Sequence, residues 1–251
     1  MGNLPGPICL IFTTRGQPGA VPAGVPASGP RTSRHLQCRT MGYRDEIRRD
    51  AQARGIQWLV HFTPFVNLLR IVEHGLLPRA ELEASGLDYT YTDSWRLDDE
   101  LGASSLSISD PAWVMLRRKR ELSPRSTWAI LYFEPSVLWT HNCRFCFRNA
   151  AQADLSKCGK NRHGPWGFWT MFEDVAPSAV FEGESYREEV GLGLHQPTRP
   201  DAEVQVRGRI APELIMGVGV SWARLVPKAQ ALMDGLNAAD GGDRIVHYKE
   251  F

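Results

Sequence analysis

Three features are missing or weak in this sequence: a long apolar run, a signal peptide and a strong net charge. No apolar run reaches the roughly 18 residues that a membrane-spanning helix needs. The apolar segment 8–12 is too short for a secretory signal peptide and has no basic flank before it. The net charge is only +1, so no global field draws the chain to nucleic acid or lipid. We therefore expect no membrane partner, and the local basic run 117–120 is either a solvated face or a track for phosphates.

Cysteine is scarce and odd in number. Five cysteines do not form a complete set of pairs, which argues against a disulfide framework and for a reducing compartment. We expect a cytoplasmic protein.

The first part of the chain differs in composition from the rest. Residues 1–40 are rich in glycine, proline, alanine, serine, threonine and arginine and show no hydrophobic periodicity. Such a segment cannot bury enough apolar surface to offset the entropy of ordering it. The composition changes at Met41, and we predict a disordered or non-essential extension over residues 1–42, followed by one domain over residues 43–251.

The domain combines several short strand patterns with few helical ones, which indicates an α+β fold. Segment 42–53 is charged and compatible with a helix, and two long stretches, 85–103 and 141–200, show few regular elements apart from a helical piece near 169–172. Loops this long in a compact domain are usually functional. Strands are predicted at 57–63, 105–109, 128–134, 203–206 and 214–220, helices at 67–73, 111–120 and 227–236, and a last strand or tail at 244–251.

Two strands carry polar residues that suggest a site. His61 faces away from Val60 and Phe62; such a histidine is either a structural hydrogen-bonding group or, together with Thr63, a donor to a ribose hydroxyl. The alternating serines at 105, 107 and 109 share one face of a strand, which is either exposed to solvent or lines a polar pocket.

Glu203 is the third polar residue in a strand pattern. Its neighbours at 202, 204 and 206 are apolar, so it shares a face with Asp201 and Gln205. It is either an exposed strand residue or a catalytic carboxylate. Cleavage of the bond between nicotinamide and ribose passes through an oxocarbenium-like state, which a nearby carboxylate stabilises. The same carboxylate can act as the base for an incoming nucleophile.

The region 141–169 holds cysteines, histidines and aromatic residues. Cys143, Cys146, Cys158 and His163, with His141 as another partner, have spacings that resemble a zinc site, but a second tight pair is missing and we assign no metal ligand. The aromatic residues of 163–169 either stack single-stranded bases or form a small satellite core.

Five blocks in the same order resemble the DarT family, toxin ADP-ribosyltransferases that modify DNA bases. The resemblance covers roughly residues 55–220. The blocks are His-Phe-Thr-Pro-x-x-Asn-Leu at 61–68 continuing into Ile-Val-Glu-His-Gly-Leu-Leu at 71–77, Leu-Ser-Ile-Ser at 106–109, Glu-Pro-Ser-Val-Leu-Trp at 134–139, Cys-x-Phe-Cys-x-x-Asn-Ala-Ala at 143–151, and Ala-Glu-Val-x-Val-x-Gly-x-Ile-x-Pro-Glu-Leu-Ile at 202–215.

The resemblance implies an ADP-ribosyltransferase-like fold: a split sheet of short strands with few helices and long functional loops. It implies NAD as co-substrate, single-stranded DNA as acceptor, and an antitoxin partner with ADP-ribosyl-hydrolase activity. Glu203 matches the catalytic glutamate, and stretch 160–202 matches the loop that presents the nucleic acid.

The resemblance also implies an NAD site and a basic residue that positions the substrate. The first NAD-binding motif corresponds to His61, Phe62 and Thr63. The strand with the alternating serines contributes Ser107 and Ser109. The basic residue is expected where this chain has Ala112, Trp113 and Val114, so the nearest candidates follow on the same predicted helix. The remaining candidates are Ser107 and Ser109 on the strand, Tyr89, Tyr91 or Arg96 in loop 85–103, Arg117 or Arg118 for the basic residue, and Arg70 for a pyrophosphate contact by charge and position alone.

Two alternatives remain open from the residues. One is an ADP-ribosyltransferase that acts on RNA or protein, because the same NAD site permits it. The other is a zinc-stabilised nucleic-acid-binding module without catalysis, built on the cysteine and aromatic region.

Overall fold

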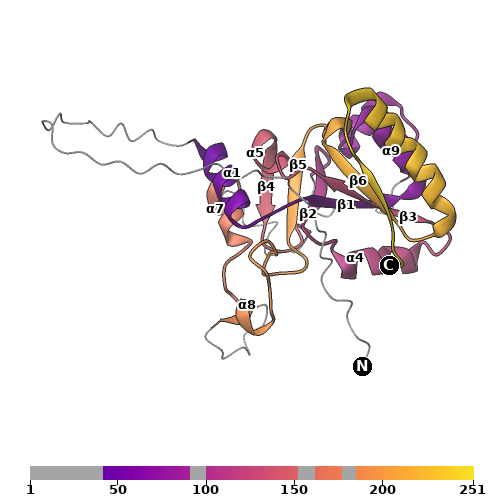
Figure 1. The fold of residues 1–251 in the computed structure, drawn as a ribbon. Helices are drawn as coiled ribbons and strands as arrows, with labels where there is room; N and C mark the ends of the chain where they lie inside the picture. Colours follow the sequence, from indigo (N-terminus) through magenta and orange to yellow (C-terminus); the bar gives the residue numbers. More distant parts are fainter. Residues whose placement is uncertain (1–41, 91–99, 152–161, 177–184) are drawn as a thin grey trace, which may run out of the picture. The chain divides into compact units, whose positions relative to one another are not determined.

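The computed structural model describes residues 42–90, 100–151, 162–176 and 185–251 (Figure 1). Of the extension expected over 1–42, the described residues include only Gly42. They also leave out the candidates Tyr91, Arg96 and Cys158. The description below concerns the unit Thr40–Phe251.

Seven strands form one sheet in the order β4-β5-β2-β1-β3-β6-β7, and all neighbours are antiparallel except β6 and β7. The strands are β1 (Leu59–Pro64), β2 (Ala103–Ile108), β3 (Trp128–Phe133), β4 (Asn142–Cys146), β5 (Glu203–Arg207), β6 (Ile215–Val220) and β7 (Ile245–Tyr248).

The sheet divides into two halves between β1 and β2. These two strands pair only at Leu59 with Ile108 and at Val60 with Ser107. Beyond this point β1 continues along β3, and the earlier residues of β2 pair with β5 instead. The short-stranded split sheet that the family resemblance implies is therefore confirmed.

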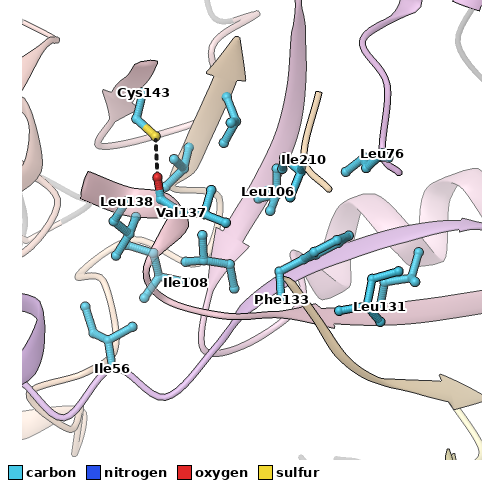
Figure 2. Close-up of a cluster of buried hydrophobic side chains, with 14 of the residues drawn as sticks. Ile56, Leu76, Leu106, Ile108, Leu131, Phe133, Val137, Leu138, Cys143 and Ile210 are labelled. Atoms are coloured by element: carbon cyan, nitrogen blue, oxygen red, sulfur yellow. Dashed lines mark hydrogen bonds between the residues drawn. The ribbon is translucent and has the colours of Figure 1, made fainter. Parts of the chain in front are cut away.

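One face of the sheet carries the main hydrophobic core. Leu59, Leu106, Phe133 and Val204 are among its buried residues, and Figure 2 shows part of this cluster. Burying a side chain of this size contributes roughly 1.5–3 kcal/mol. Two groups of helices cover this face: α1 (Tyr43–Ala53), α5 (Val137–Thr140) and α7 (Gly164–Thr170) beside β4, and α2 (Leu68–His74) and α9 (Val226–Asp240) beside β6 (Figure 1).

The opposite face has a second, smaller core under α4 (Trp113–Leu122). Leu116 of α4 packs with Val60, Trp128 and Ile130. Because Ser107 pairs with Val60, the side chain of Ser107 lies on this α4 face as well.

The last strand is reached by a crossover. β7 runs parallel to β6, and a parallel pair needs a long connection between its strands. The turn η3 (Ala223–Leu225) and the helix α9 provide it. The predicted strand or tail at 244–251 is thus a strand.

The predicted strands and helices all appear, with shifted ends, but α3 (Arg79–Ser85), β4 and α8 (Tyr186–Glu189) were not predicted. α3 buries none of its residues, so no apolar periodicity marks it. β4 places only Cys143 and Phe145 in the main core, and its alternate residues are polar or thiol-bearing. The remaining short elements are η1 (Phe65–Asn67) and η2 (Pro212–Leu214). None of the helices in the described segments is long and apolar enough to cross a membrane.

Gly75 allows the backbone at the end of α2 to lie close to the segment that follows β5. Its φ and ψ of 84° and 175° lie in a region that only glycine adopts readily. The next residue, Leu76, bridges to Ile210, and a Cβ at Gly75 would lie 2.3 Å from the carbonyl oxygen of Ile210.

We expect Gly75→Ala to lower the free energy of unfolding by about 3–4 kcal/mol, because backbone strain and a steric clash add. Gly86→Ala is the matched control: Gly86 also has a positive φ, of 66°, but no atom lies within 4 Å of the place that a Cβ would take there. Gly86→Ala should lower the free energy of unfolding through backbone strain alone, by about 1–2 kcal/mol. Chemical denaturation measures both, and equal losses would contradict the role of the close approach.

Candidate active site

Three adjacent strands bring the polar residues of the sequence motifs together at the split in the sheet. Val60 of β1 pairs with Ser107 of β2, and Leu106 of β2 pairs with Val204 of β5. The antiparallel register then places Glu203 level with Ser107. Since neighbouring strands lie about 4.8 Å apart, the backbones of Glu203 and Val60 are only about 10 Å apart.

His61 spans the point where β1 and β2 part. Strand alternation would direct its side chain toward the main core, but its Nδ1 lies 2.9 Å from the carbonyl oxygen of Ser105 on β2. A carbonyl oxygen only accepts, so Nδ1 carries the proton of this hydrogen bond. The half-buried imidazole therefore connects the two halves of the sheet.

Asn67 ties the end of β1 to the start of a long loop. Its Nδ2 donates to Thr63 Oγ1 at 2.9 Å and to the carbonyl oxygen of Thr90 at 2.7 Å, and its Oδ1 accepts from the Thr90 backbone N–H at 2.8 Å. Although Asn67 precedes α2, its side chain makes no capping bond to that helix. Asn67 belongs to the motif at 61–68, but the sequence alone indicates no role for it, because an asparagine at the start of a helix is compatible with an ordinary N-cap.

Glu203 opens β5 and is oriented by a turn after β4. Its Oε2 accepts from the backbone N–H of Ala150 at 2.9 Å, and Asp201 Oδ2 accepts from that of Asn149 at 3.3 Å. The side chain of Glu203 is half-buried and lies on the α4 face of the sheet. The carboxylate is thus held in one orientation beside Ser107, and it is neither fully buried nor a freely exposed surface residue.

A second carboxylate, that of Glu100, forms ion pairs with two arginines on the sheet face that carries Glu203. Arg144 lies opposite Gln205, and Arg207 is two residues further along β5. Glu100 Oε2 accepts from Arg144 Nη1 at 2.5 Å and from Arg207 Nη2 at 2.9 Å. Burial would raise the pKa of Glu100, but the two guanidinium groups outweigh it and hold the pKa below its ordinary value.

The end of β2 receives the segment that precedes β5. Ser109 has a φ of 65°, the only positive value at a non-glycine residue in the described part of the chain. Its hydroxyl donates to the carbonyl oxygen of His195 at 3.1 Å, and Gln196 Nε2 donates to Asp110 Oδ2 at 2.8 Å. Ser109 therefore contacts the later loop in this structure, and its predicted contact with NAD remains a prediction.

The other predicted site residues lie on different elements. Phe62 packs on the Trp128 ring, at 6.1 Å between centroids. Arg117 is exposed on α4, the helix that covers the face carrying Glu203. Arg70 is on α2, which packs on the opposite face, and pairs with Glu73 at 3.0 Å. The structure thus places Arg117, and not Arg70, on the side of the sheet where Glu203 lies.

The two cysteines of the Cys-x-x-Cys pattern point to opposite faces of β4. Cys143 is in the main core, where its thiol donates to the carbonyl oxygen of Val137 at 3.4 Å (Figure 2), and burial raises its pKa to about 12. Cys146 packs with Ala150 on the other side. Residues three apart on a strand cannot chelate one ion, so the pair does not supply the tight half of a zinc site.

The aromatic segment after these cysteines is mainly core. Phe168 is fully buried and contacts Phe145 and Phe172. Trp169 packs against the same cluster, and Trp166 is 70% exposed. Phe168 and Trp169 therefore belong to the main core and not to a separate satellite core.

The sequence matches the model of one protein family over residues 60–245, described as ssDNA thymidine ADP-ribosyltransferase, DarT. This chain belongs to the DarT family. The resemblance inferred from the motifs is confirmed, and with it the expected class of enzyme, an NAD-dependent ADP-ribosyltransferase of single-stranded DNA. No curated protein is significantly similar to the sequence.

Solved structures of the DarT family share the fold at low sequence identity. Thermus sp. 2.9 DarT in complex with NAD+ matches with a TM-score of 0.50 and 13% identity, over 77% of this chain and 96% of that chain. The same protein in complex with ADP-ribosylated ssDNA gives 0.49 and 13%, over 78% and 95%. Thermosipho africanus DarTG in complex with ADP-ribose gives 0.45 and 16%, over 76% and 49%, so the chain spans about half the length of that protein.

The Glu100 ion pairs predict a pH-dependent contribution to stability. The folded-state pKa of Glu100 lies below the ordinary 4.5, so its contribution is complete above that value and is lost as the pH falls through the lower folded-state pKa. Glu100→Gln should lower the free energy of unfolding by about 0.5–1 kcal/mol at neutral pH. Urea unfolding over a pH series should show the two proteins converging in acid, and a constant difference at all pH values would contradict the assignment.

Proposed function

We propose that this chain transfers ADP-ribose from NAD to thymidine in single-stranded DNA, with Glu203 as the catalytic carboxylate. The observation that carries the proposal is that Ser107 and the oriented Glu203 lie level on the α4 face at the split of the sheet, where the His61 ring bonds across the gap between β1 and β2. The family description supports the substrate, and the NAD+ and ADP-ribosylated ssDNA bound to Thermus sp. 2.9 DarT support both ligands.

In the proposed reaction, the bond between nicotinamide and ribose C1′ breaks and nicotinamide leaves with the bonding electron pair. Positive charge then develops on the ribose, and the Glu203 carboxylate stabilises it electrostatically. A ring nitrogen of the base attacks C1′ and gives its proton to Glu203. Single-stranded DNA suits this chemistry, because the reactive edge of a base is hidden inside a duplex.

The NAD site lies along β1 and β2 in this proposal. His61 and Thr63 contact ribose hydroxyls, Phe62 contributes an apolar wall, and Ser107 and Ser109 add hydroxyl groups. Arg96, outside the described residues, contacts the nicotinamide or the phosphates. The exposed position of Arg117 on the α4 face supports it as the basic residue that positions the substrate, whereas Arg70 remains a pyrophosphate candidate by charge alone.

The biological setting forms part of the same proposal. The chain acts as a toxin, and its antitoxin partner removes ADP-ribose; the name of Thermosipho africanus DarTG supports a linked pair. Residues 43–251 form the catalytic domain, and residues 1–42 are dispensable for catalysis. The DNA substrate and the odd number of cysteines support a cytoplasmic location.

Glu203→Gln should lower the rate of transfer by roughly 10²–10³-fold, because the amide keeps the shape of the side chain but loses its charge. The measurement is mass spectrometry of short oligonucleotides after incubation with NAD, with one base varied at a time. Glu213→Gln, an exposed glutamate on η2, is the matched control. Wild-type activity of Glu203→Gln would refute the catalytic role, and modification of RNA but not DNA would refute the acceptor.

Asn67→Asp tests the support of the NAD site. The carboxylate still accepts from the Thr90 N–H but no longer donates to Thr63 or to the Thr90 carbonyl. We expect the KM for NAD to rise about tenfold, equivalent to about 1.4 kcal/mol, with an unfolding temperature close to that of wild type. An unchanged KM would show that Asn67 does not position Thr63 for NAD.

A further inference from the structure

β2 ends in a strained turn that is centred on Ser109. The φ of 65° at Ser109 is a left-handed value, which a residue with a Cβ rarely adopts. The N–H of Asp110 donates to the carbonyl oxygen of Ile108 at 2.7 Å. A hydrogen bond between residues two apart, around a positive φ, defines the rarer and more strained type of γ-turn. Such a conformation persists only where the surrounding contacts hold it.

Trp58 supplies the contacts that hold this turn. Its indole Nε1–H donates to the carbonyl oxygen of Ser109 at 2.6 Å, and its backbone carbonyl oxygen accepts from the Ser109 N–H at 3.2 Å. Both backbone polar groups of Ser109 are therefore bonded to one residue, which directly precedes β1. Because Ser109 is only 8% exposed, the loss of the indole N–H would leave a poorly hydrated carbonyl oxygen.

The indole takes the place of a backbone group at the end of the ladder between β1 and β2. A hydrogen-bonded antiparallel pair exchanges two N–H···O bonds between its backbones. Trp58 and Ser109 follow the pair of Leu59 with Ile108 in the register, and here the carbonyl oxygen of Ser109 accepts from the indole. Trp58 thus extends the contact of the two strands by one position, at the end away from the split.

The indole ring is itself held by aromatic packing. It meets the ring of Tyr132 on β3 edge-on, with 6.0 Å between centroids. Tyr132 makes a similar contact with His247 on β7, at 6.1 Å. Trp58 also packs against the smaller core under α4. These neighbours fix the direction of the Nε1–H toward the turn.

The turn is close to the proposed active site along the chain and across the sheet. Ser107, which is level with Glu203, lies two positions before Ser109, and only two residue pairs otherwise join β1 and β2. The turn also leads the chain from β2 into α4, the helix that carries Arg117. A displacement of the turn would therefore move Ser107 relative to Glu203 and would shift the start of α4.

We infer that Trp58 is a positioning residue for the transfer of ADP-ribose: its indole N–H holds the strained turn at Ser109 and keeps Ser107 level with Glu203. The inference rests on the proposed function, because it concerns the geometry of that site. Trp58 acts through the backbone of β2, and contact with either substrate is not required of it.

Trp58→Phe removes the N–H and keeps an aromatic ring against Tyr132. We expect kcat for transfer to a single-stranded oligonucleotide to fall about tenfold or more, because small displacements of reacting groups lower rates steeply. The rate is expressed per NAD-binding site, counted by calorimetry, so that misfolded protein does not contribute. The KM for NAD should change less than about threefold. Trp139→Phe, at a tryptophan packed against the main core, is the matched control.

Glycine at position 109 distinguishes the release of strain from a loss of packing. Ser109→Gly and Ser109→Ala both remove the hydroxyl, but only glycine adopts a positive φ without strain. Adding Trp58→Phe should lower kcat about tenfold in the alanine background and less than about threefold in the glycine background. Equal losses in both backgrounds, or a failure to fold in both, would show that Trp58 acts through packing and would overturn the inference.

Hydrogen exchange without substrates measures the turn directly. In Trp58→Phe, the amides of residues 109 and 110 should exchange about tenfold faster or more, whereas those of β3 keep their wild-type rates. Unchanged exchange at the turn would contradict its dependence on the indole.

The outcomes separate this inference from the proposed function. If the wild-type chain does not modify single-stranded DNA, the proposed function fails, and the role of Trp58 in transfer fails with it even where hydrogen exchange shows that it holds the turn. If the wild-type chain modifies DNA but Trp58→Phe keeps the wild-type kcat, the inference alone is overturned. A fall in kcat that glycine at position 109 largely removes supports it.

Discussion

The feature on which the rest of the site depends is the early end of pairing between β1 and β2. Two strands in the middle of a sheet share only two residue pairs and then continue with different neighbours. Backbone groups at such an edge need other partners, because buried polar groups are rarely left unsatisfied. The His61 ring at the Ser105 carbonyl oxygen meets this demand on one side.

In the proposed mechanism, Glu203 owes its role to its position beside the split between β1 and β2. A glutamate at the start of a strand is ordinarily exposed to solvent. The apolar residues next to Glu203 in the sequence do not by themselves distinguish an exposed residue from a catalytic one. The N–H of Ala150 fixes its orientation, and the register with β2 places it beside Ser107. Neither contact involves a residue near Glu203 in the chain, so its role depends on how β4, β5 and β2 come together.

The strands and their apolar faces were predictable from the sequence, whereas the contacts that hold the site were not. Leu59, Phe133 and Val204 belong to strong local patterns, and these strands appear where they were expected. By contrast, Ser109 meets His195 across 86 residues and Arg207 meets Glu100 across 107. No local pattern encodes such pairs, because each side chain is compatible with a solvated surface until the fold brings its partner near. β4 was missed for a related reason: its alternate residues include the polar Asn142 and Arg144, so it lacks the apolar run of a buried strand.

The described contacts divide the site into two independently supported sides. Asn67 holds Thr63 and Thr90 on the side of β1, and Arg187 and Gln196 hold the loop 193–198 on the side of β5. The two sets share no residue, and they meet only across β2, where Ser107 and Ser109 lie two positions apart. Coupling between mutations without common partners is usually weak, so under the proposed function we expect donor binding and acceptor binding to respond separately to mutation. A chain under selection for a different acceptor could therefore vary the loop before β5 and leave the β1 side intact, which suits a fold that remains recognisable when only 13% of the residues are identical.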